Sequence, residues 1–173
     1  MKAIVSYTFF LGLCTLGQAD TKEVKAGDLS LKIPSTWTQE QPSSSMRLAQ
    51  FVVPGSKEGE HADLVIYYFG AASGGGVRAN IDRWVGQFAE KGRTAKESKG
   101  TSTNGTYDLV TVTGTYNKPV GPPIMRKSQP TPNQRMLAAI VQTAKGNYFI
   151  KFTGPEKTLN TAEKAFMESF GAE

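Results

Sequence analysis

The segment at residues 62–69 is apolar on both of its faces, and this restricts the fold more than any other feature of the chain. In an extended strand, alternate side chains point to opposite sides of the sheet. One face of the segment carries Leu64, Ile66 and Tyr68, and the other carries Val65, Tyr67 and Phe69. A strand of this composition needs a packing layer on each side. The sequence therefore predicts a central strand in a sheet that is covered on both faces.

Other strand-like segments are joined by short turns. Residues 24–26 and 29–33 flank Gly27-Asp28 and are expected to form a hairpin, as are residues 134–143 and 147–153 across Lys145-Gly146. The remaining expected strands are residues 47–53, 62–69, 94–98 and 106–116, with a loop at residues 39–45. Because hairpins join antiparallel neighbours, the pattern predicts an α+β domain built on an antiparallel sheet of about eight strands.

Two segments have the spacing of long amphipathic helices, which we expect to flank the sheet. The first spans residues 77–91, ends at Gly92, and has its apolar side chains at Val77, Ile81, Trp84, Val85 and Phe88. The second begins after Gly154-Pro155, ends at Gly171, and places Leu159, Ala162, Phe166 and Phe170 on one face. Proline at a helix start and glycine at a helix end are the usual boundaries.

Three local patterns resemble a known fold. A hairpin runs into Ile33-Pro34-Ser35-Thr36-Trp37, an aromatic strand leads into a helix with a tryptophan, and a late strand runs into the final helix over residues 148–170. The chain resembles the PsbP/Mog1-like α-β-α sandwich, and residues 42–54 and 146–170 resemble small secreted bacterial proteins of unknown function. The resemblance implies a binding or accessory role, because that fold includes an extrinsic photosystem II subunit and a Ran-binding protein. It carries over no partner-binding residue.

The first 19 residues have the organisation of a secretory signal peptide. Lys2 precedes an apolar run at residues 3–16, which is followed by Gly17-Gln18-Ala19. We therefore expect cleavage after residue 19, a single domain at residues 20–173, and a periplasmic or secreted protein. Leu13 directly before Cys14 fits a lipoprotein signal badly, so lipidation is not expected. No later segment has the apolar length of a transmembrane helix.

The residues left after cleavage restrict the chemistry. Of the 20 Lys and Arg residues, Lys2 is removed, so 19 basic residues face 15 acidic ones and the formal charge is +4. That charge is too small to indicate nucleic-acid binding. One histidine and no cysteine argue against a zinc site, and the acidic stretch with Glu58, Glu60 and Asp63 is interpreted as a surface turn. We expect no cofactor, no metal and no enzymatic activity.

His61 carries the alternative of a hydrolase or transferase with Ser or Asp chemistry. Asp63 or Asp82 would orient the imidazole, and one of several serines would be the nucleophile. No Gly-x-Ser-x-Gly motif accompanies it. We interpret His61 as a solvated loop histidine. The alternative requires its imidazole to lie within hydrogen-bond reach of both a carboxylate and a hydroxyl.

A glycine-rich segment between a strand and a helix is a candidate anion or ligand site. Its residues are Gly74, Gly75, Gly76 and Arg78. Backbone N–H groups at a helix start, the helix dipole and a guanidinium together attract anions. The segment lacks both the dinucleotide-binding and the phosphate-loop spacing. A flexible crossover between strand and helix explains the glycines equally well.

The longest expected loop, at residues 117–133, contains five prolines and is predicted to be neither helix nor inner strand. No acidic residue occurs between Asp108 and Glu156. The candidate partner-binding residues in and beside the loop are Lys118, Ile124, Met125, Arg126, Lys127 and Arg135. A basic loop with an apolar centre can dock on an acidic protein, glycan or membrane surface, whereas the plainer interpretation is a mobile solvated loop.

The leading interpretation is an exported, non-enzymatic binding or accessory domain. It would recognise an unknown protein or an acidic ligand through the basic, proline-rich loop, and we expect it to be a monomer. One alternative is the enzyme around His61. Another is a structural subunit of an envelope assembly, which predicts an exposed apolar patch larger than a few hundred Å².

Overall fold

The computed structural model describes residues 20–71, 73–121, 123–125 and 127–172. The expected signal peptide lies outside this part of the chain. The elements in chain order are β1 (Thr21–Ala26), β2 (Leu29–Pro34), β3 (Thr38–Glu40), β4 (Arg47–Pro54), β5 (His61–Tyr68), α1 (Val77–Val85), β6 (Thr94–Ser102), β7 (Gly105–Pro119), the 3-10 helix η1 (Pro123–Met125), β8 (Ser128–Thr143), β9 (Gly146–Pro155) and α2 (Glu156–Ser169).

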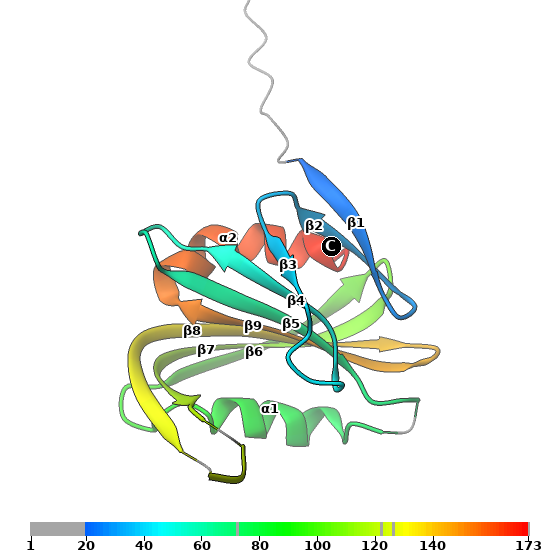
Figure 1. Ribbon diagram of the computed structural model, residues 1–173. Coiled ribbons are helices and arrows are strands. Elements are labelled where there is room, and N and C mark those ends of the chain that lie inside the picture. Colours follow the sequence, from blue (N-terminus) through cyan, green and yellow to red (C-terminus); the bar gives the residue numbers. More distant parts are fainter. Residues whose placement is uncertain (1–19, 72, 122, 126, 173) are drawn as a thin grey trace, which may run out of the picture.

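The domain has three layers, with the large sheet in the middle (Figure 1). Seven strands follow the order β3-β4-β5-β9-β8-β7-β6, and every neighbouring pair is antiparallel. Helix α2 and the separate β1–β2 hairpin lie on one face, and α1 lies on the other. Strand β5 pairs with β4 and β9 and is buried on both faces at Leu64, Val65 and Ile66. The prediction of an α+β domain with an antiparallel sheet between two helices is confirmed.

The core on the α2 face is aromatic and continuous. Phe152 of β9 stacks on Phe166 of α2 with ring centroids 5.5 Å apart, and it meets Trp37 at 5.6 Å. The β1–β2 hairpin adds its alternate apolar side chains to the same cluster. Burying large apolar side chains such as these stabilises the fold by about 1.5–3 kcal/mol each. The apolar face predicted for the last helix is therefore the face that packs, and Gly171 follows the helix with φ +73°.

The core on the α1 face covers only one half of the sheet. Ile81, Trp84 and Phe88 pack against side chains of β7, β8 and β9, and among the described residues this cluster contains none from β3 or β4. The other half carries a polar network in which Gln50 of β4 accepts a hydrogen bond from Arg47 at 2.6 Å and donates to Glu40 at 3.2 Å. Helix α1 thus leaves one half of this face polar.

Helix α1 is shorter than the sequence predicted. It ends at Val85 instead of residue 91, and Gly86 caps it. The chain beyond it turns to the sheet: Ala89 N–H donates to Thr115 O at 2.9 Å, and Phe88 forms an isolated bridge with Tyr116. The apolar spacing continued through Phe88 because this side chain is buried by the strand contact, not because the helix continues.

The prediction of a long loop at residues 117–133 is wrong. Strands β7 and β8 continue as a pair through this region, with Tyr116 opposite Thr131 and Pro119 opposite Ser128. Strand β9 ends its pairing with β8 at Gln134, so the extension has a free side on which β8 needs no hydrogen-bond donors, and proline is tolerated in such a position. We call residues 116–131 the β7–β8 arm.

Two further boundaries differ from the expectations. Residues 38–40, partly within the expected loop at residues 39–45, form the short edge strand β3 against β4. Strand β6 runs through Ser102, although its exposed, polar composition predicted only residues 94–98. Pairing with the long strand β7 explains this length, because backbone hydrogen bonds do not require apolar side chains. Within the described part of the chain, no helix has both the length and the apolar character needed to cross a membrane.

Candidate functional site

A cavity of about 220 Å³ lies at the base of the β7–β8 arm. One wall comes from the start of β5 and the preceding turn, the opposite wall from the arm and the adjoining part of β8, and the remaining wall from the end of β9. Its polar lining residues are Glu60, His61, Asp63, Tyr116, Lys118, Thr131, Gln134 and Thr153. The cavity therefore gathers groups of both charges from segments distant in the sequence.

Several of these groups have no partner within the described residues. Asp63 and Lys118 form no ion pair there, and the buried Thr153 Oγ1 has no hydrogen-bond partner. Glu60 lies 3.8 Å from Lys57 Nζ in an exposed ion pair, which contributes little to stability. The cavity has unused hydrogen-bonding capacity.

His61 does not have the environment that the enzyme alternative requires. It is exposed at the first position of β5, and no side-chain hydrogen bond of its imidazole occurs among the described residues. The nearby Thr131 hydroxyl donates instead to Gln129 O at 3.3 Å. No hydroxyl–imidazole–carboxylate chain is therefore formed at this cavity within the described part of the protein.

Lys151 of β9 is the most unusual ionisable group near the cavity, and the sequence analysis did not select it. Its Nζ donates to Gln87 Oε1 at 2.6 Å and to Tyr116 OH at 3.2 Å, and it lies 5.3 Å from the Tyr116 ring centre. No carboxylate pairs with it in the described residues. The signal that could have identified it was a charged residue between Ile150 and Phe152, within the otherwise apolar run at residues 148–152.

Burial lowers the pKa of Lys151 to about 8, and the positive charges of Arg83 and Arg47 act in the same direction, while Asp63 opposes them. Burial likewise raises the pKa of the Tyr116 hydroxyl to about 12. The amine therefore loses its proton more readily than an exposed lysine, and the phenol keeps its proton at neutral pH. The pair can hold a hydrogen bond here, but among the residues that the structure describes neither group bonds to a nucleophile or a carboxylate that would complete a catalytic arrangement.

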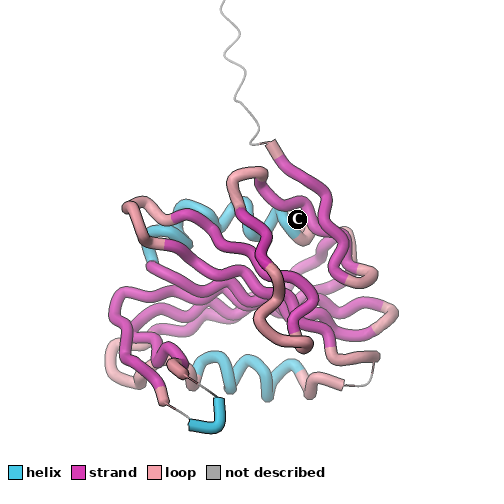
Figure 2. The backbone as a smooth tube through the Cα atoms, in the orientation of Figure 1, coloured by secondary structure: helices cyan, strands magenta, loops and turns pink. Residues whose placement is uncertain are grey.

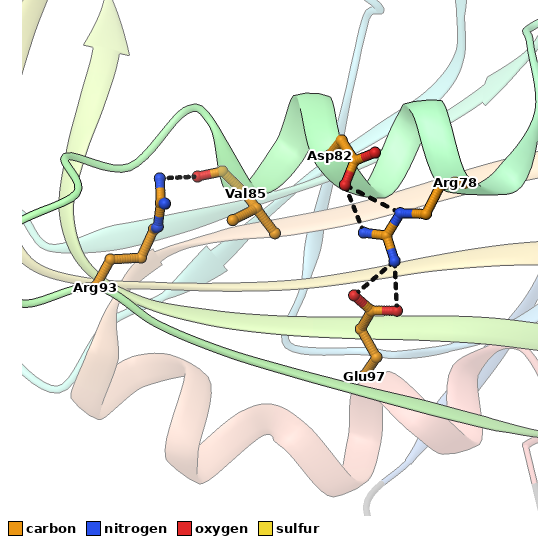
Figure 3. Close-up of polar contacts among 5 residues, drawn as sticks. All are labelled: Arg78, Asp82, Val85, Arg93 and Glu97. Atoms are coloured by element: carbon orange, nitrogen blue, oxygen red, sulfur yellow. Dashed lines mark hydrogen bonds and ion pairs between the residues drawn. The ribbon is translucent and has the colours of Figure 1, made fainter.

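The residues of the predicted anion site lie at the start of α1, and the Arg78 guanidinium is already hydrogen-bonded within the protein. Arg78 Nε donates to Asp82 Oδ1 at 3.0 Å, and Nη1 donates to both carboxylate oxygens of Glu97 at 2.9 Å (Figure 3). Arg93, also drawn there, donates to Val85 O at 3.3 Å and fastens the helix end. The carboxylates of Asp82 and Glu97 thus already bind the guanidinium that an anion would need.

The glycines of this segment have a structural role. The buried Asn80 side chain donates to Gly74 O at 2.8 Å and to Gly76 O at 3.0 Å, and so closes the turn before α1. A Cβ at Gly74 would lie 2.7 Å from the Phe149 ring, so only glycine fits there. The crossover interpretation of Gly74, Gly75 and Gly76 accounts for the geometry, and anion binding there stays a prediction.

The residues of the proline-rich segment are divided between two places. Lys118, Ile124, Met125 and Lys127 lie on the arm and are exposed. Arg135 is elsewhere: its side chain is 12% exposed and forms a bidentate pair with Glu163 of α2 at 2.8 and 3.0 Å. Arg126 lies outside the described residues. The structure therefore brings four of the six predicted residues together on one projection.

Comparison with known proteins agrees with this architecture. The solution structure of cyanobacterial PsbP (CyanoP) from Synechocystis sp. PCC 6803 aligns with a TM-score of 0.51, covering 90% of this chain and 93% of the other at 13% identity. The chain has a PsbP-like fold. No protein-family model matches it, and no curated protein matches its sequence. The expected PsbP/Mog1-like sandwich is confirmed at the level of fold, which by itself does not determine function.

Proposed function

We propose that this protein is an exported, non-enzymatic binding domain that docks on an acidic partner through its β7–β8 arm. The observation that supports the proposal is the arm tip, where Ile124 is 89% exposed and Met125 is 51% exposed. Lys118 and Lys127 are exposed on the same arm and have no ion pair within the described residues. An apolar tip with unneutralised cations beside it is the composition of a contact surface for an anionic partner.

The arm is held firmly at its base, which suits a binding element. Asn117 N–H donates to Gln87 O at 2.9 Å, and the Tyr116 ring packs on Phe88 with centroids 5.2 Å apart. Strand pairing continues to Pro119, and Val120 N–H donates to Lys127 O at 3.0 Å. Because the described backbone below the tip is already hydrogen-bonded before binding, little of its conformational entropy is lost on docking.

The PsbP-like fold and the state of His61 both support a role without catalysis. The resemblance stated from the sequence implies an accessory protein, and the one histidine lacks the hydrogen bonds of a general base among the described residues. Export rests on the organisation of residues 1–19.

Site-specific photo-crosslinking tests the proposal. A photoreactive amino acid is placed at Ile124, and a matched control carries it at Lys157, an exposed position on α2. Envelope fractions of the source cell are then irradiated with each protein. We expect a defined adduct, protein or lipid, from position 124 and none from position 157. Adducts of equal yield from both positions, or none from 124, would show that the arm is not the docking element.

A further inference from the structure

The arm tip is convex and small. The 3-10 helix η1, drawn cyan in Figure 2, closes the far end of a two-stranded ribbon, and the arm ends beyond the layer of α1 (Figures 1 and 2). Ile124 is the most exposed of the large apolar side chains described. A stable protein–protein interface buries roughly 800 Å² per partner, far more than two side chains on a projection provide. A bilayer has no such requirement, because its interface accepts any projecting apolar group.

The lysines of the arm lie close to the apolar tip, where lipid headgroups would be if the tip entered a bilayer. Lys118 is opposite Gln129, and Lys127 pairs through its carbonyl with Val120, so both lysines are a few positions from the apolar tip. Neither lysine forms an ion pair within the described residues, although Glu60 and Asp63 line the same cavity as Lys118. Stable membrane binding needs two signals, and an apolar insertion with a basic patch supplies both.

The base of the arm limits how far it could enter a membrane. Cations at Lys118 and polar groups at the cavity lie immediately behind the tip, and the next large side chain, Tyr116, is buried against Phe88. Among the described residues of the arm, Ile124 and Met125 are the exposed large apolar side chains that can leave water. The geometry suits shallow insertion at the headgroup boundary.

We propose that the acidic partner of the β7–β8 arm is the surface of an anionic lipid bilayer. In this arrangement Ile124 and Met125 enter the interface while Lys118 and Lys127 contact the lipid headgroups. This inference rests on the proposed docking function and names its partner.

Vesicle co-sedimentation tests the inference with residues 20–173, which contain all three layers of the fold. Vesicles of phosphatidylcholine alone are compared with vesicles containing about 30 mol% phosphatidylglycerol. We expect binding to the anionic vesicles, much weaker binding to the neutral ones, and loss of binding as the ionic strength rises toward about 1 M. Lys118→Gln with Lys127→Gln should lower the partition coefficient roughly 25-fold, since each lysine near the surface contributes roughly fivefold.

The apolar part is tested separately. Ile124→Ser with Met125→Ser should lower binding at least roughly tenfold. Matched controls are Lys96→Gln with Lys157→Gln, which remove two exposed lysines elsewhere, and Met46→Ser with Leu48→Ser, which remove exposed apolar side chains just before β4 and near its start. Both controls should bind as the parent protein does. In an Ile124→Trp variant, the tryptophan emission should shift to shorter wavelength with anionic vesicles only.

The outcomes separate this inference from the proposed function. Failure of the parent protein to bind anionic vesicles, or equal binding by the arm variants, would overturn the lipid assignment. If position 124 then crosslinks to a protein in envelope fractions, the arm remains the docking element and its partner is proteinaceous. If position 124 yields no adduct either, both proposals are wrong.

Discussion

Replacing Lys151 with methionine should stabilise the fold at neutral pH. Lys151 lies in the apolar strand β9 with Gln87 and Tyr116 as its hydrogen-bond acceptors, and its pKa falls from 10.5 to about 8. Each pKa unit corresponds to about 1.4 kcal/mol, so keeping the amine charged in the folded protein costs about 3 kcal/mol. Methionine has a similar length and no charge, but it leaves Gln87 Oε1 and Tyr116 OH without the two hydrogen bonds of the amine, which costs about 2 kcal/mol. The expected net gain at pH 7 is therefore about 1 kcal/mol.

The sign of the pH dependence follows from the direction of the shift. Because the folded pKa is the lower one, the unfolded chain binds more protons between pH 8 and pH 10.5, and parent stability rises with pH in this window. The cost of the lysine is full below pH 8, falls through the window, and is absent above pH 10.5. The stability of Lys151→Met relative to the parent protein should therefore fall by about 2 kcal/mol between about pH 7 and about pH 10.

Urea unfolding followed by tryptophan fluorescence measures this difference at each pH. Trp37 and Trp84 are buried in the two cores, so their emission reports the loss of both packing layers. Lys96→Met is the matched control, because it makes the same replacement at a lysine that is exposed on β6. A Lys151→Met advantage that stays constant from neutral to alkaline pH, or a loss of stability at pH 7, would refute the reasoning.

Three further changes test the packing. Arg135→Gln breaks a bidentate pair at a half-exposed Glu163 and should cost about 1–3 kcal/mol in urea unfolding, whereas no loss would mean that the pair does not persist in solution. Gly105→Ala should destabilise the fold by at least about 2 kcal/mol, because Gly105 has φ +143° and an added Cβ would collide with the Gln142 carbonyl; an unchanged melting temperature would contradict this. Replacing residues 120–127 with Asn-Gly should change stability by less than about 1 kcal/mol, since both cores lie outside this segment, and a larger loss would show that the arm tip supports the sheet.

The fold could be predicted from the sequence where burial and periodicity agree. Residues 62–69 identified the central strand because apolar side chains on both faces admit no other position, and Leu159 and Phe166 identified the packed face of α2. The end of α1 could not be predicted in this way. Phe88 continues the helical spacing, but its burial comes from a tertiary contact with Tyr116, and periodicity does not distinguish the two sources of burial.

The sequence did not predict the arm because the prolines were taken to exclude any strand, whereas they exclude only a strand that is hydrogen-bonded on both sides. Pro130 cannot donate a hydrogen bond, which excludes it from a strand with neighbours on both sides. The part of β8 before Gln134 pairs with β7 but not with β9. Pro130 can therefore lie opposite Asn117 without a hydrogen bond on its other side. Whether a strand is internal or at an edge is a property of the whole topology, and a local sequence pattern does not contain it.

The candidate residues show the same limit for electrostatics. A stretch without acidic residues predicted that Arg135 and Lys118 would both be available to a partner. In the folded chain, Arg135 meets Glu163, which lies 28 positions later and belongs to α2. Lys118 escapes such neutralisation because the arm carries it beyond the part of β8 that faces α2 and pairs with β9. Isolation of a charge along the sequence is therefore weak support for a binding surface, whereas isolation that remains after folding is the property that a docking element needs.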